Sequence, residues 1–355
     1  MTNRTNERAP LVLIVGGGIT GLKAALTLDD FEIPAVIVEK SGELGGKVRG
    51  YAKTFPDFRS GRALVSELVE RVDATEKIRV LRHCTVSGVR TEGDLYRVHL
   101  SDGTSLGVHA VILAFGFEPF DATRQEEYGY GVYPNVIAAQ ELEALLDPLG
   151  PTKGRLLRPS DGKPVRKAAI IFCVGSRSKR TDSPYCSRIC CSYSTKQAIE
   201  IKEADPDAQV VCFYMDIRTY DRGVEEMHQY AREIGVKYIR GRVSDCSPLP
   251  DGDILVRAEN TLLGKPVQGV FDLVSLSVGM MPSPDTAGLA EMLGIELGTD
   301  GFFVSADGGL SPHDTAREGI FLAGAVTGLK PIRDCILEGT SAGGRVAAYL
   351  RKRRG

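Results

Sequence analysis

The sequence lacks the features that mark several classes of protein. It has no excess charge of one sign, since 44 Lys and Arg residues stand against 46 Asp and Glu residues in a chain of 355. This balance gives no support to nucleic acid as a partner or to a membrane-surface role. The apolar run at residues 11–15, which follows a polar N-terminus, is too short for a signal sequence or a spanning helix. We therefore expect a cytoplasmic protein without membrane insertion.

Two kinds of catalytic motif are also missing. The five histidines form no cluster in the sequence, so neither a catalytic histidine nor a histidine metal site is indicated. No Cys-x-x-Cys motif occurs, which weighs against a dithiol reductase. The chain does have eight cysteines, some of them adjacent. This pattern fits thiolate or metal chemistry in a reducing compartment better than a secreted disulfide framework.

A dinucleotide-binding pattern is present near the N-terminus. A short apolar strand leads into a helix rich in Ala and Leu through three glycines, Gly16, Gly18 and Gly21. In this fingerprint the first glycine permits a tight turn, the second lets a pyrophosphate approach, and the third allows close helix packing. A second apolar strand ends at Glu39, whose carboxylate can accept the hydroxyls of an adenosine ribose. A glycine-rich turn that only packs is the alternative.

The segments that follow resemble flavoproteins with two dinucleotide-binding domains. Gly45 and Gly46 match a second glycine pair that lies close to the flavin diphosphate in those proteins. Residues 319–325 resemble their second flavin strand, although Ala325 stands where many of them place an aspartate for the ribityl chain. The helix that begins near Pro331 would direct its N-terminal dipole at the flavin. The resemblance implies FAD, with contacts from the three fingerprint glycines and from Glu39, Lys40, Gly45, Gly46, Lys47, Val86, Ala114, Gly116, Gly324, Ala325 and Ile332.

Smaller elements are predicted between these segments. Residues 95–105 read as a β-hairpin with an Asp-Gly turn, and residues 108–114 as a strand that leads to Phe115 and Gly116. For Lys47 two interpretations stay open. It either approaches the flavin ring and favours the anionic reduced form, or it is a solvated lysine.

The middle of the chain has the element order of a nucleotide-binding domain without its phosphate loop. A Pro- and Gly-rich stretch at 150–164 predicts a linker. After it we expect strands at 167–173, 209–215 and 237–240, with helices at about 187–203 and 225–234. The first strand is followed by Cys-Val-Gly-Ser-Arg, so NAD(P)H binding is not favoured here. The predicted fold is α/β, with a discontinuous FAD-binding Rossmann domain at 1–160 and 262–355 and an inserted Rossmann-like domain at 161–261.

Four cysteines lie where that phosphate loop is expected. Cys173 ends the first strand, at the sheet edge where ligands bind, and Cys186, Cys190 and Cys191 open the predicted helix. Cys186 and Cys190 can share a helix face, whereas Cys191 is turned by about 100°. This fan favours an iron-sulfur cluster over mononuclear zinc, and redox-active or merely buried cysteines are the other interpretations. Basic residues nearby would offset the charge of a cluster or form a solvated loop face: Arg177, Lys179, Arg180 and Arg188.

Several motifs together are similar to the A subunit of heterodisulfide reductase. They are the cysteine pattern, Phe-Tyr-Met-Asp-Ile-Arg at 213–218, Gly-Val-Lys-Tyr-Ile-Arg-Gly at 235–241 and Lys-Thr-Phe-Pro at 53–56. The resemblance implies an FAD-binding, thioredoxin-reductase-like core, a homodimer, and partners similar to the B and C subunits of heterodisulfide reductase. It also implies a [4Fe-4S] cluster on four thiolates: Cys173, Cys186, Cys190 and Cys191.

The chain departs from the methanogen-type members of that family in two ways. No ferredoxin-type cysteine run occurs, and Asp57 follows Lys-Thr-Phe-Pro where those members tend to have cysteine. The chain is therefore similar to the short form found in heterodisulfide-reductase-like complexes of sulfur-oxidising prokaryotes. This implies an electron-transfer subunit in cytoplasmic sulfur oxidation, in which FAD exchanges electron pairs and the cluster moves single electrons.

Two other functions stay open. One is a self-sufficient NAD(P)H-dependent flavin disulfide reductase with a dithiol among Cys186, Cys190 and Cys191, and the other is a flavin-bound assembly scaffold. The remaining cysteines are expected to pack as small hydrophobic residues: Cys84, Cys212, Cys246 and Cys335.

Overall fold

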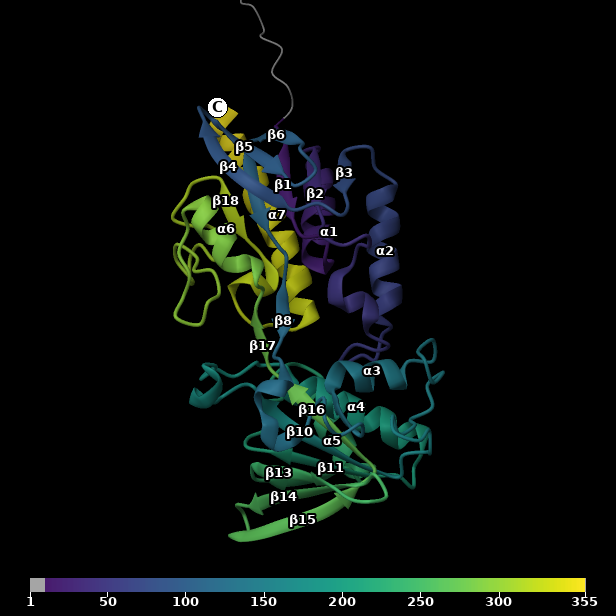
Figure 1. The fold of residues 1–355 in the computed structure, drawn as a ribbon. Helices are drawn as coiled ribbons and strands as arrows, with labels where there is room; N and C mark the ends of the chain where they lie inside the picture. The colour runs from purple at the N-terminus through teal and green to yellow at the C-terminus, as the bar shows by residue number, and fades with distance from the viewer. Residues whose placement is uncertain (1–9, 355) are drawn as a thin grey trace, which may run out of the picture. The chain divides into compact units, whose positions relative to one another are not determined.

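The computed structural model of the protein describes residues 10–354, which form two compact units. The first unit comprises the chain up to Arg49, residues 62–118 and the chain from Pro282 onward, and the second comprises residues 50–61 and 119–281. Both contain helices and parallel strands, coloured by residue number in Figure 1. No helix within the described range is both long and apolar enough to cross a membrane.

The first unit is built on a five-stranded parallel sheet with strand order β18-β7-β1-β2-β3. Every side chain of β1, β2 and β7 is buried, as expected for parallel strands that are covered on both faces. The strands of this sheet are β1 (Val12–Val15), β2 (Ala35–Val38), β3 (Ile78–Leu81), β7 (Ala110–Leu113) and β18 (Ile320–Leu322).

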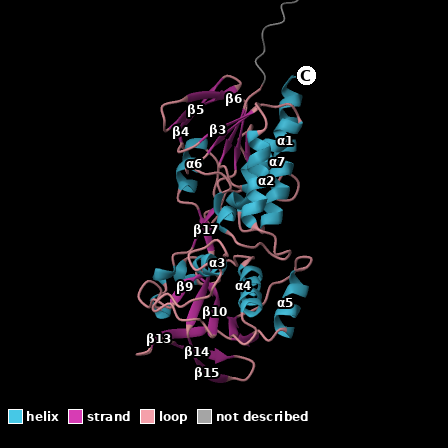
Figure 2. Ribbon diagram, turned by 90° about the vertical axis from the view of Figure 1, so that its right-hand side faces the viewer, coloured by secondary structure: helices cyan, strands magenta, loops and turns pink. Residues whose placement is uncertain are grey.

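Two long helices of the first unit pack closely on each other, as Figure 2 shows for α1 (Ile19–Asp30) and α7 (Ile332–Arg354). Glycine makes this approach possible, because a Cβ on Gly339 would lie 2.5 Å from the Thr20 carbonyl oxygen. The other elements of this unit are α2 (Gly61–Asp73), α6 (Asp285–Leu293) and the antiparallel strands β4 (Val86–Glu92), β5 (Leu95–Leu100) and β6 (Ser105–Val108). The antiparallel pairing of β5 with β6 confirms the predicted hairpin.

The second unit has its own five-stranded parallel sheet, with order β12-β11-β10-β16-β9, and a separate three-stranded antiparallel sheet, β13-β14-β15. The parallel strands are β9 (Val136–Ala138), β10 (Lys167–Val174), β11 (Gln209–Tyr214), β12 (Lys237–Arg240) and β16 (Leu273–Val278). The helices are α3 (Ala139–Leu146), α4 (Cys190–Ala204) and α5 (Val224–Glu233), and the antiparallel strands are β13 (Val243–Pro248), β14 (Ile254–Asn260) and β15 (Lys265–Phe271).

The remaining elements are short. A two-stranded ribbon, made of β8 (Phe117–Pro119) and β17 (Met280–Pro282), carries the chain out of the first unit and back. The 3-10 helices are η1 (Gly46–Gly50), η2 (Ala122–Arg124), η3 (Glu126–Tyr128), η4 (Lys179–Thr181) and η5 (Gly324–Thr327).

The unit boundaries differ from the predicted boundaries at 160/161 and 261/262. The longer segment of the second unit begins at Pro119, because β9 joins its sheet by pairing with β16, which lies far along the chain. It ends at Met281 because β15 and β16 belong to its two sheets. Both pairings join distant segments, so local sequence patterns do not reveal them.

The predicted linker at 150–164 is also wrong, because this segment packs into the second unit. Leu157 forms a β-bridge with Pro164, and the Arg158 side chain is buried. Its guanidinium donates to Asp253 Oδ1 at 2.7 Å and to the Asp251 carbonyl oxygen at 2.8 Å. A segment rich in Pro and Gly is thus held in place by one buried arginine.

Candidate functional site

The glycine fingerprint has the geometry that its sequence predicts. Gly16 has a φ of +108°, in the region that favours glycine, and a Cβ on Gly21 would lie 1.9 Å from the Gly16 carbonyl oxygen. Gly18 differs from both, because no atom lies within 4 Å of the position that its Cβ would take. The space in front of Gly18 is therefore open, as a diphosphate at the N-terminus of α1 requires.

The second glycine pair lies against the fingerprint. The backbone N–H of Gly45 donates to the Gly17 carbonyl oxygen at 2.8 Å, and Gly45 forms a β-bridge with Gly18. Gly45 and Gly46 both have a positive φ, of +103° and +57°. Two glycine backbones thus run side by side with no side chains between them, which fits the cradle of a flavin diphosphate.

Glu39 lies directly after β2, where the sequence predicts the ribose contact, and is buried. Its Oε2 accepts a hydrogen bond from the Gly17 N–H, and its Oε1 accepts one from the Ser41 N–H, both at 2.8 Å. Oε1 also accepts from the Ser41 hydroxyl at 2.8 Å, so these bonds fix the carboxylate beside the glycine loop and leave one lone pair, on Oε2. A hydroxyl of a ribose can donate to it.

The other predicted flavin contacts in this unit are two lysines in ion pairs, one glycine with open space beside it, and residues at the ends of strands and helices. Lys40 forms an ion pair with Asp285 at 3.0 Å, and Lys47 forms one with Glu118 at 2.9 Å. Gly116 has a φ of +83° and open space around its Cβ position. The other predicted contacts lie at strand and helix ends: Val86 begins β4, Ala114 follows β7, Gly324 and Ala325 begin η5, and Ile332 begins α7.

Glu338 is a residue that the sequence reasoning missed in this region. Its Oε2 accepts a hydrogen bond from the Gly324 N–H at 2.8 Å, and its Oε1 pairs with Lys330 at 2.7 Å. Gly324 has a φ of +73°. Glu338 therefore holds the turn that contains Ala325, the position where the expected aspartate is absent.

Three of the four predicted cluster cysteines come together in the second unit. Cys173 lies near the end of β10, past a break in the strand register, and has a φ of +61°. Cys190 and Cys191 are the first two residues of α4. The exposed fractions of the three residues are 7%, 1% and 2%. The Cys190 thiol lies within hydrogen-bonding distance of the thiols of Cys173 and Cys191.

The three thiols differ in acidity. The hydrogen bond from Cys190, together with the charge of Arg177, lowers the pKa of Cys173 to about 7 in spite of its burial. The hydrogen bond from Cys190 also lowers the pKa of Cys191, and the Arg218 backbone N–H adds to this effect. The pKa of Cys190 itself is raised well above its usual value by its two thiol neighbours and by burial. Because Cys190 has a single thiol proton to donate, its hydrogen bond favours ionisation of either Cys173 or Cys191.

The prediction that Cys186 lies on the same helix face as Cys190 is wrong. The helix begins at Cys190, and Cys186 lies in the preceding loop, half-buried. Its Sγ accepts a hydrogen bond from the Arg188 backbone N–H at 3.3 Å. Within residues 10–354, no three or more His, Cys, Asp or Glu side chains are already arranged to hold a metal ion.

The loop that joins Cys173 to Cys190 is held by groups from other segments. The Gly175 N–H donates to the buried Gln125 Oε1 at 2.7 Å, and Arg177 pairs with Asp216 at 2.7 Å. Four residues of this loop that are not glycine have a positive φ: Cys173, Arg177, Asp182 and Arg188. Such backbone conformations cost free energy and persist where the surrounding structure enforces them, which is common at ligand sites.

A buried ionic network supports the same helix. Lys196 of α4 is 2% exposed, and its Nζ lies 2.6 Å from Glu143 Oε2 and 2.9 Å from Glu200 Oε2. Glu143 Oε1 also accepts from the backbone N–H of Ala52 at 3.1 Å, and Lys196 donates to the Lys53 carbonyl oxygen at 3.1 Å. This network, which the sequence reasoning missed, fixes the Lys-Thr-Phe-Pro segment on the second unit.

Aromatic residues in and next to that segment pack into the core of the second unit. Phe55 and Phe58 pack against the apolar cluster that contains Cys173, Cys190 and Cys191. Asp57 accepts a hydrogen bond from the Thr54 hydroxyl at 2.9 Å. Asp57 thus closes the turn of this segment.

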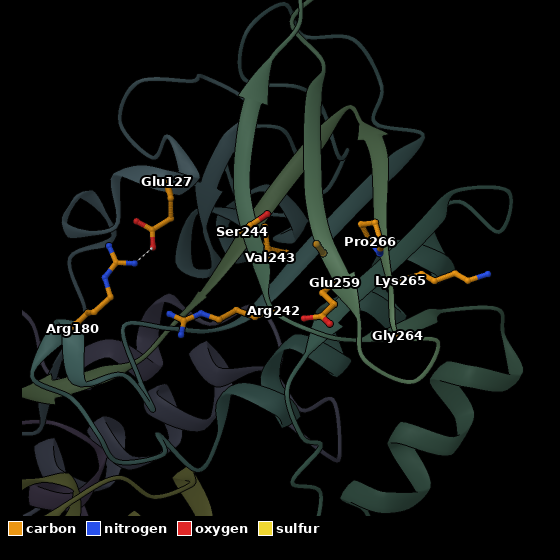
Figure 3. A pocket seen from close by; sticks show the side chains of 10 residues that line it. Glu127, Arg180, Arg242, Val243, Ser244, Glu259, Gly264, Lys265 and Pro266 are labelled. Carbon is orange, nitrogen blue, oxygen red and sulfur yellow. Dashed lines mark ion pairs between the residues drawn. The ribbon is translucent and has the colours of Figure 1, made fainter.

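The cysteines outside the site are buried, as predicted: Cys84, Cys212, Cys246 and Cys335. A pocket of about 610 Å³ lies elsewhere in the second unit, on β13, β14 and β15. Figure 3 shows its charged lining, with Arg180 and Glu127 paired at 3.5 Å. None of the predicted flavin contacts or cluster cysteines lines it, whereas Arg180, one of the basic residues expected near the cluster, does.

Comparison with known proteins defines the class of this fold. The family model for pyridine nucleotide-disulphide oxidoreductases matches residues 4–133. Thioredoxin reductase from Lactococcus lactis covers 97% of this chain and is itself covered to 99%, with a TM-score of 0.67 and 18% identity. The thioredoxin reductase from T. acidophilum has a TM-score of 0.66 at 16% identity, again over 97% of this chain. The chain therefore has the thioredoxin-reductase-like Rossmann fold, and residues 4–133 are similar to pyridine nucleotide-disulphide oxidoreductases.

Sequence comparison finds relatives of a more specific kind than the fold comparison does. One iron-sulfur A subunit of the CoB–CoM heterodisulfide reductase of Methanopyrus kandleri is 33% identical over 95% of this chain, and the corresponding iron-sulfur protein of Methanocaldococcus jannaschii is 34% identical over 94%. Over nearly its whole length the chain is similar to the A subunits of heterodisulfide reductase. It spans 64% and 63% of the length of these two relatives.

Proposed function

We propose that the protein is an electron-transfer subunit in which FAD is coupled to a [4Fe-4S] cluster held by Cys173, Cys186, Cys190 and Cys191. The observation that carries this proposal is the meeting of three thiols, two of them with a lowered pKa, at the carboxyl edge of a parallel sheet. In nucleotide-binding domains this edge holds the ligand. The relatives from Methanopyrus kandleri and Methanocaldococcus jannaschii are iron-sulfur subunits, which supports the same cofactor.

The residues of the second unit fit a cluster in their chemistry. Iron-sulfur clusters are bound by thiolates, and hydrogen bonds to the sulfur atoms stabilise their negative charge. Backbone N–H groups already donate to Cys186 and Cys191, from Arg188 and Arg218. The fourth thiol, Cys186, lies in the loop, and its approach to the other three would complete the ligand set.

The residues of the first unit fit FAD. Gly18 and Gly116 leave open space where a side chain would stand, and Glu39 is fixed beside the glycine loop. A bound flavin exchanges electrons in pairs and singly, and so can link a two-electron donor to a one-electron cluster. The chain's own part is to hold the diphosphate at the N-terminus of α1 and the ribose at Glu39.

The setting that we propose is a complex similar to heterodisulfide reductase, with partners similar to its B and C subunits, and with cytoplasmic sulfur oxidation as the pathway. The names of the relatives, which are A subunits, support the existence of partner subunits. A homodimer is part of the same proposal. The sulfur chemistry would belong to the partners, and this chain would supply or remove the electrons.

The test is anaerobic purification followed by measurement of flavin, iron and sulfide. We expect one FAD and about four iron and four sulfide atoms per chain, with an electron paramagnetic resonance signal after reduction. A preparation that contains flavin but no iron contradicts the cluster. A preparation that contains neither contradicts the whole proposal.

A second function is favoured by one observation, the hydrogen bond between Cys190 and the readily ionised Cys173. A thiolate beside a thiol is also the arrangement of a redox-active dithiol, as in a flavin disulfide reductase that uses NAD(P)H. The two functions differ in what the oxidised protein contains. Titration of an iron-free, denatured preparation with a thiol reagent would show two fewer thiols if Cys173 and Cys190 form a disulfide, and no such loss if they bind a cluster.

A further inference from the structure

We propose that the pocket on β13, β14 and β15 binds a phosphorylated, hydroxyl-bearing small molecule of about the size of a mononucleotide, and that this ligand steadies the loop between Cys173 and Cys190. The pocket has a volume of about 610 Å³, within the range of about 300–1,000 Å³ that is usual for small-molecule sites. It shares no residue with the predicted flavin contacts or the cluster cysteines. The site is therefore independent of both proposed cofactors.

The lining of the pocket carries more positive than negative charge. It includes three cationic side chains and two carboxylates: Arg180, Arg242, Lys265, Glu127 and Glu259. Arg180 and Glu127 form an ion pair at 3.5 Å. Within residues 10–354, no ion pair is formed by Arg242, Lys265 or Glu259. Two unpaired cations against one unpaired carboxylate leave the pocket positive, which favours an anionic ligand.

Two arginines provide a place for the anionic group. Figure 3 shows the Arg242 guanidinium directed toward Arg180. Arg242 also interacts with the hydroxyl of the buried Tyr128, which restricts the positions that the arginine side chain can take. Because guanidinium groups bind phosphate through paired N–H donors, we expect a phosphate to lie between Arg180 and Arg242.

The rest of the pocket fits a ligand with hydroxyl groups and an apolar face. Val243 and Ala258 are paired across β13 and β14, and with Pro266 of β15 they give the pocket apolar surface. The Glu259 carboxylate lies in the same pocket. An ionised carboxylate only accepts hydrogen bonds, and the hydroxyls of a sugar are suitable donors. A phosphate, hydroxyls and an apolar ring are the groups that a mononucleotide combines.

One wall of the pocket belongs to the loop that carries the cysteines. Arg180 lies in η4, and its partner Glu127 accepts a hydrogen bond from Gln125 Nε2 at 3.3 Å. The Oε1 of the same glutamine accepts from the Gly175 N–H at 2.7 Å, two residues beyond Cys173. A ligand that holds Arg180 and its partner would therefore restrict the motion of this loop.

The experiment measures binding by calorimetry to protein that has been loaded with FAD and freed of the excess, so that the predicted FAD site is filled. AMP is the probe, and inorganic phosphate and adenosine test its two parts. Arg242→Gln removes a cation from the pocket, and Lys237→Gln on β12 makes the same change of charge outside it. Because Arg242 contacts Tyr128, thermal unfolding checks that this variant is folded. Lys265→Gln tests the pocket at a second, exposed position.

We expect AMP to bind at least about tenfold more tightly than adenosine or inorganic phosphate. Arg242→Gln should weaken AMP binding by about tenfold or more and Lys265→Gln by about threefold, whereas Lys237→Gln should change it by less than about twofold. Absence of AMP binding, or equal binding in the pocket variants and the Lys237 variant, would overturn the site. Inorganic phosphate that binds as tightly as AMP would overturn the class of ligand.

The effect on the loop is measured by hydrogen–deuterium exchange of its backbone amides. Saturating AMP should slow exchange at residues 175–183 by about threefold or more in the wild type, and by less than about twofold in Arg242→Gln at the same concentration. Unchanged exchange in the wild type with bound AMP would overturn the coupling to the loop. The iron content of the protein bears only on the proposed function, so failure of one proposal is distinguishable from failure of the other.

Discussion

The buried Gln125 side chain accepts a hydrogen bond from the Gly175 N–H at 2.7 Å, two residues beyond Cys173. Gln125 lies about fifty residues earlier in the chain, so a distant segment fixes the start of the cysteine loop. Replacement by leucine removes the acceptor and leaves a buried N–H unpaired. We expect Gln125→Leu to lower the free energy of unfolding by about 1–3 kcal/mol, measured by urea denaturation.

The same variant tests whether the loop must be fixed for a cluster to bind. Iron per chain should fall in Gln125→Leu, which removes the acceptor oxygen of the Gly175 N–H. Full iron content in the leucine variant would show that this hydrogen bond supports only the fold.

Substitution by alanine should have different effects at two glycines of the fingerprint: weaker FAD binding at Gly18 and lower stability at Gly21. A Cβ on Gly18 meets no atom within 4 Å, so Gly18→Ala should leave the FAD-free protein within about 1 kcal/mol of wild-type stability and weaken FAD binding. A Cβ on Gly21 would lie 1.9 Å from the Gly16 carbonyl oxygen, so Gly21→Ala should destabilise the protein without FAD as well. Thermal unfolding with and without FAD separates the two effects, and equal stability losses in both variants would contradict this assignment.

The Lys196 network predicts a large loss of stability. Lys196→Met leaves Glu143 buried without its cation and Glu200 with only Lys53, at 3.8 Å, and breaking a buried ion pair in this way costs about 3–5 kcal/mol. The exposed Lys237, at the start of β12, is the control, and Lys237→Met should change stability by less than about 0.5 kcal/mol. Chemical denaturation monitored by circular dichroism measures both, and similar small changes would show that the network contributes little.

His228 predicts a dependence of stability on pH. Burial lowers the pKa of this histidine below its usual value, and its ring lies 4.7 Å from that of Tyr238. The unfolded state therefore binds more protons as the pH falls through the ordinary histidine range, near about 6.5. Stability should drop from that pH downward, and His228→Phe should reduce the slope. An unchanged slope in the variant, measured by denaturation at several pH values, would assign the pH dependence to other groups.

The strands around both sites could be predicted from the sequence because their signals are local. Uninterrupted apolar runs predict β1, β2 and β10, and the spaced glycines predict the turn into α1. The position of Cys186 could not be predicted in this way. The spacing of four residues to Cys190 suits a helix, but the Ser187 hydroxyl accepts from the Met280 N–H in β17, and the helix starts only at Cys190.

The supporting residues were missed for a related reason. Gln125 binds the Gly175 N–H in the cysteine loop, and Glu143 binds Lys196 of α4. Both partners lie about fifty residues further along the chain. A single buried glutamine or lysine has no sequence pattern that distinguishes it from an exposed one. The same holds for β9, which joins the second sheet through β16 alone.

The most direct test of the account compares two alanine variants of buried cysteines in the second unit. Cys190→Ala removes the thiol that contacts both Cys173 and Cys191, and Cys246→Ala removes one in β13, within a different apolar cluster. After anaerobic purification, Cys246→Ala should retain about four iron atoms per chain and the resonance signal of the reduced cluster, whereas Cys190→Ala should lose most of both while keeping FAD. Wild-type levels of iron in Cys190→Ala would contradict the cluster assignment.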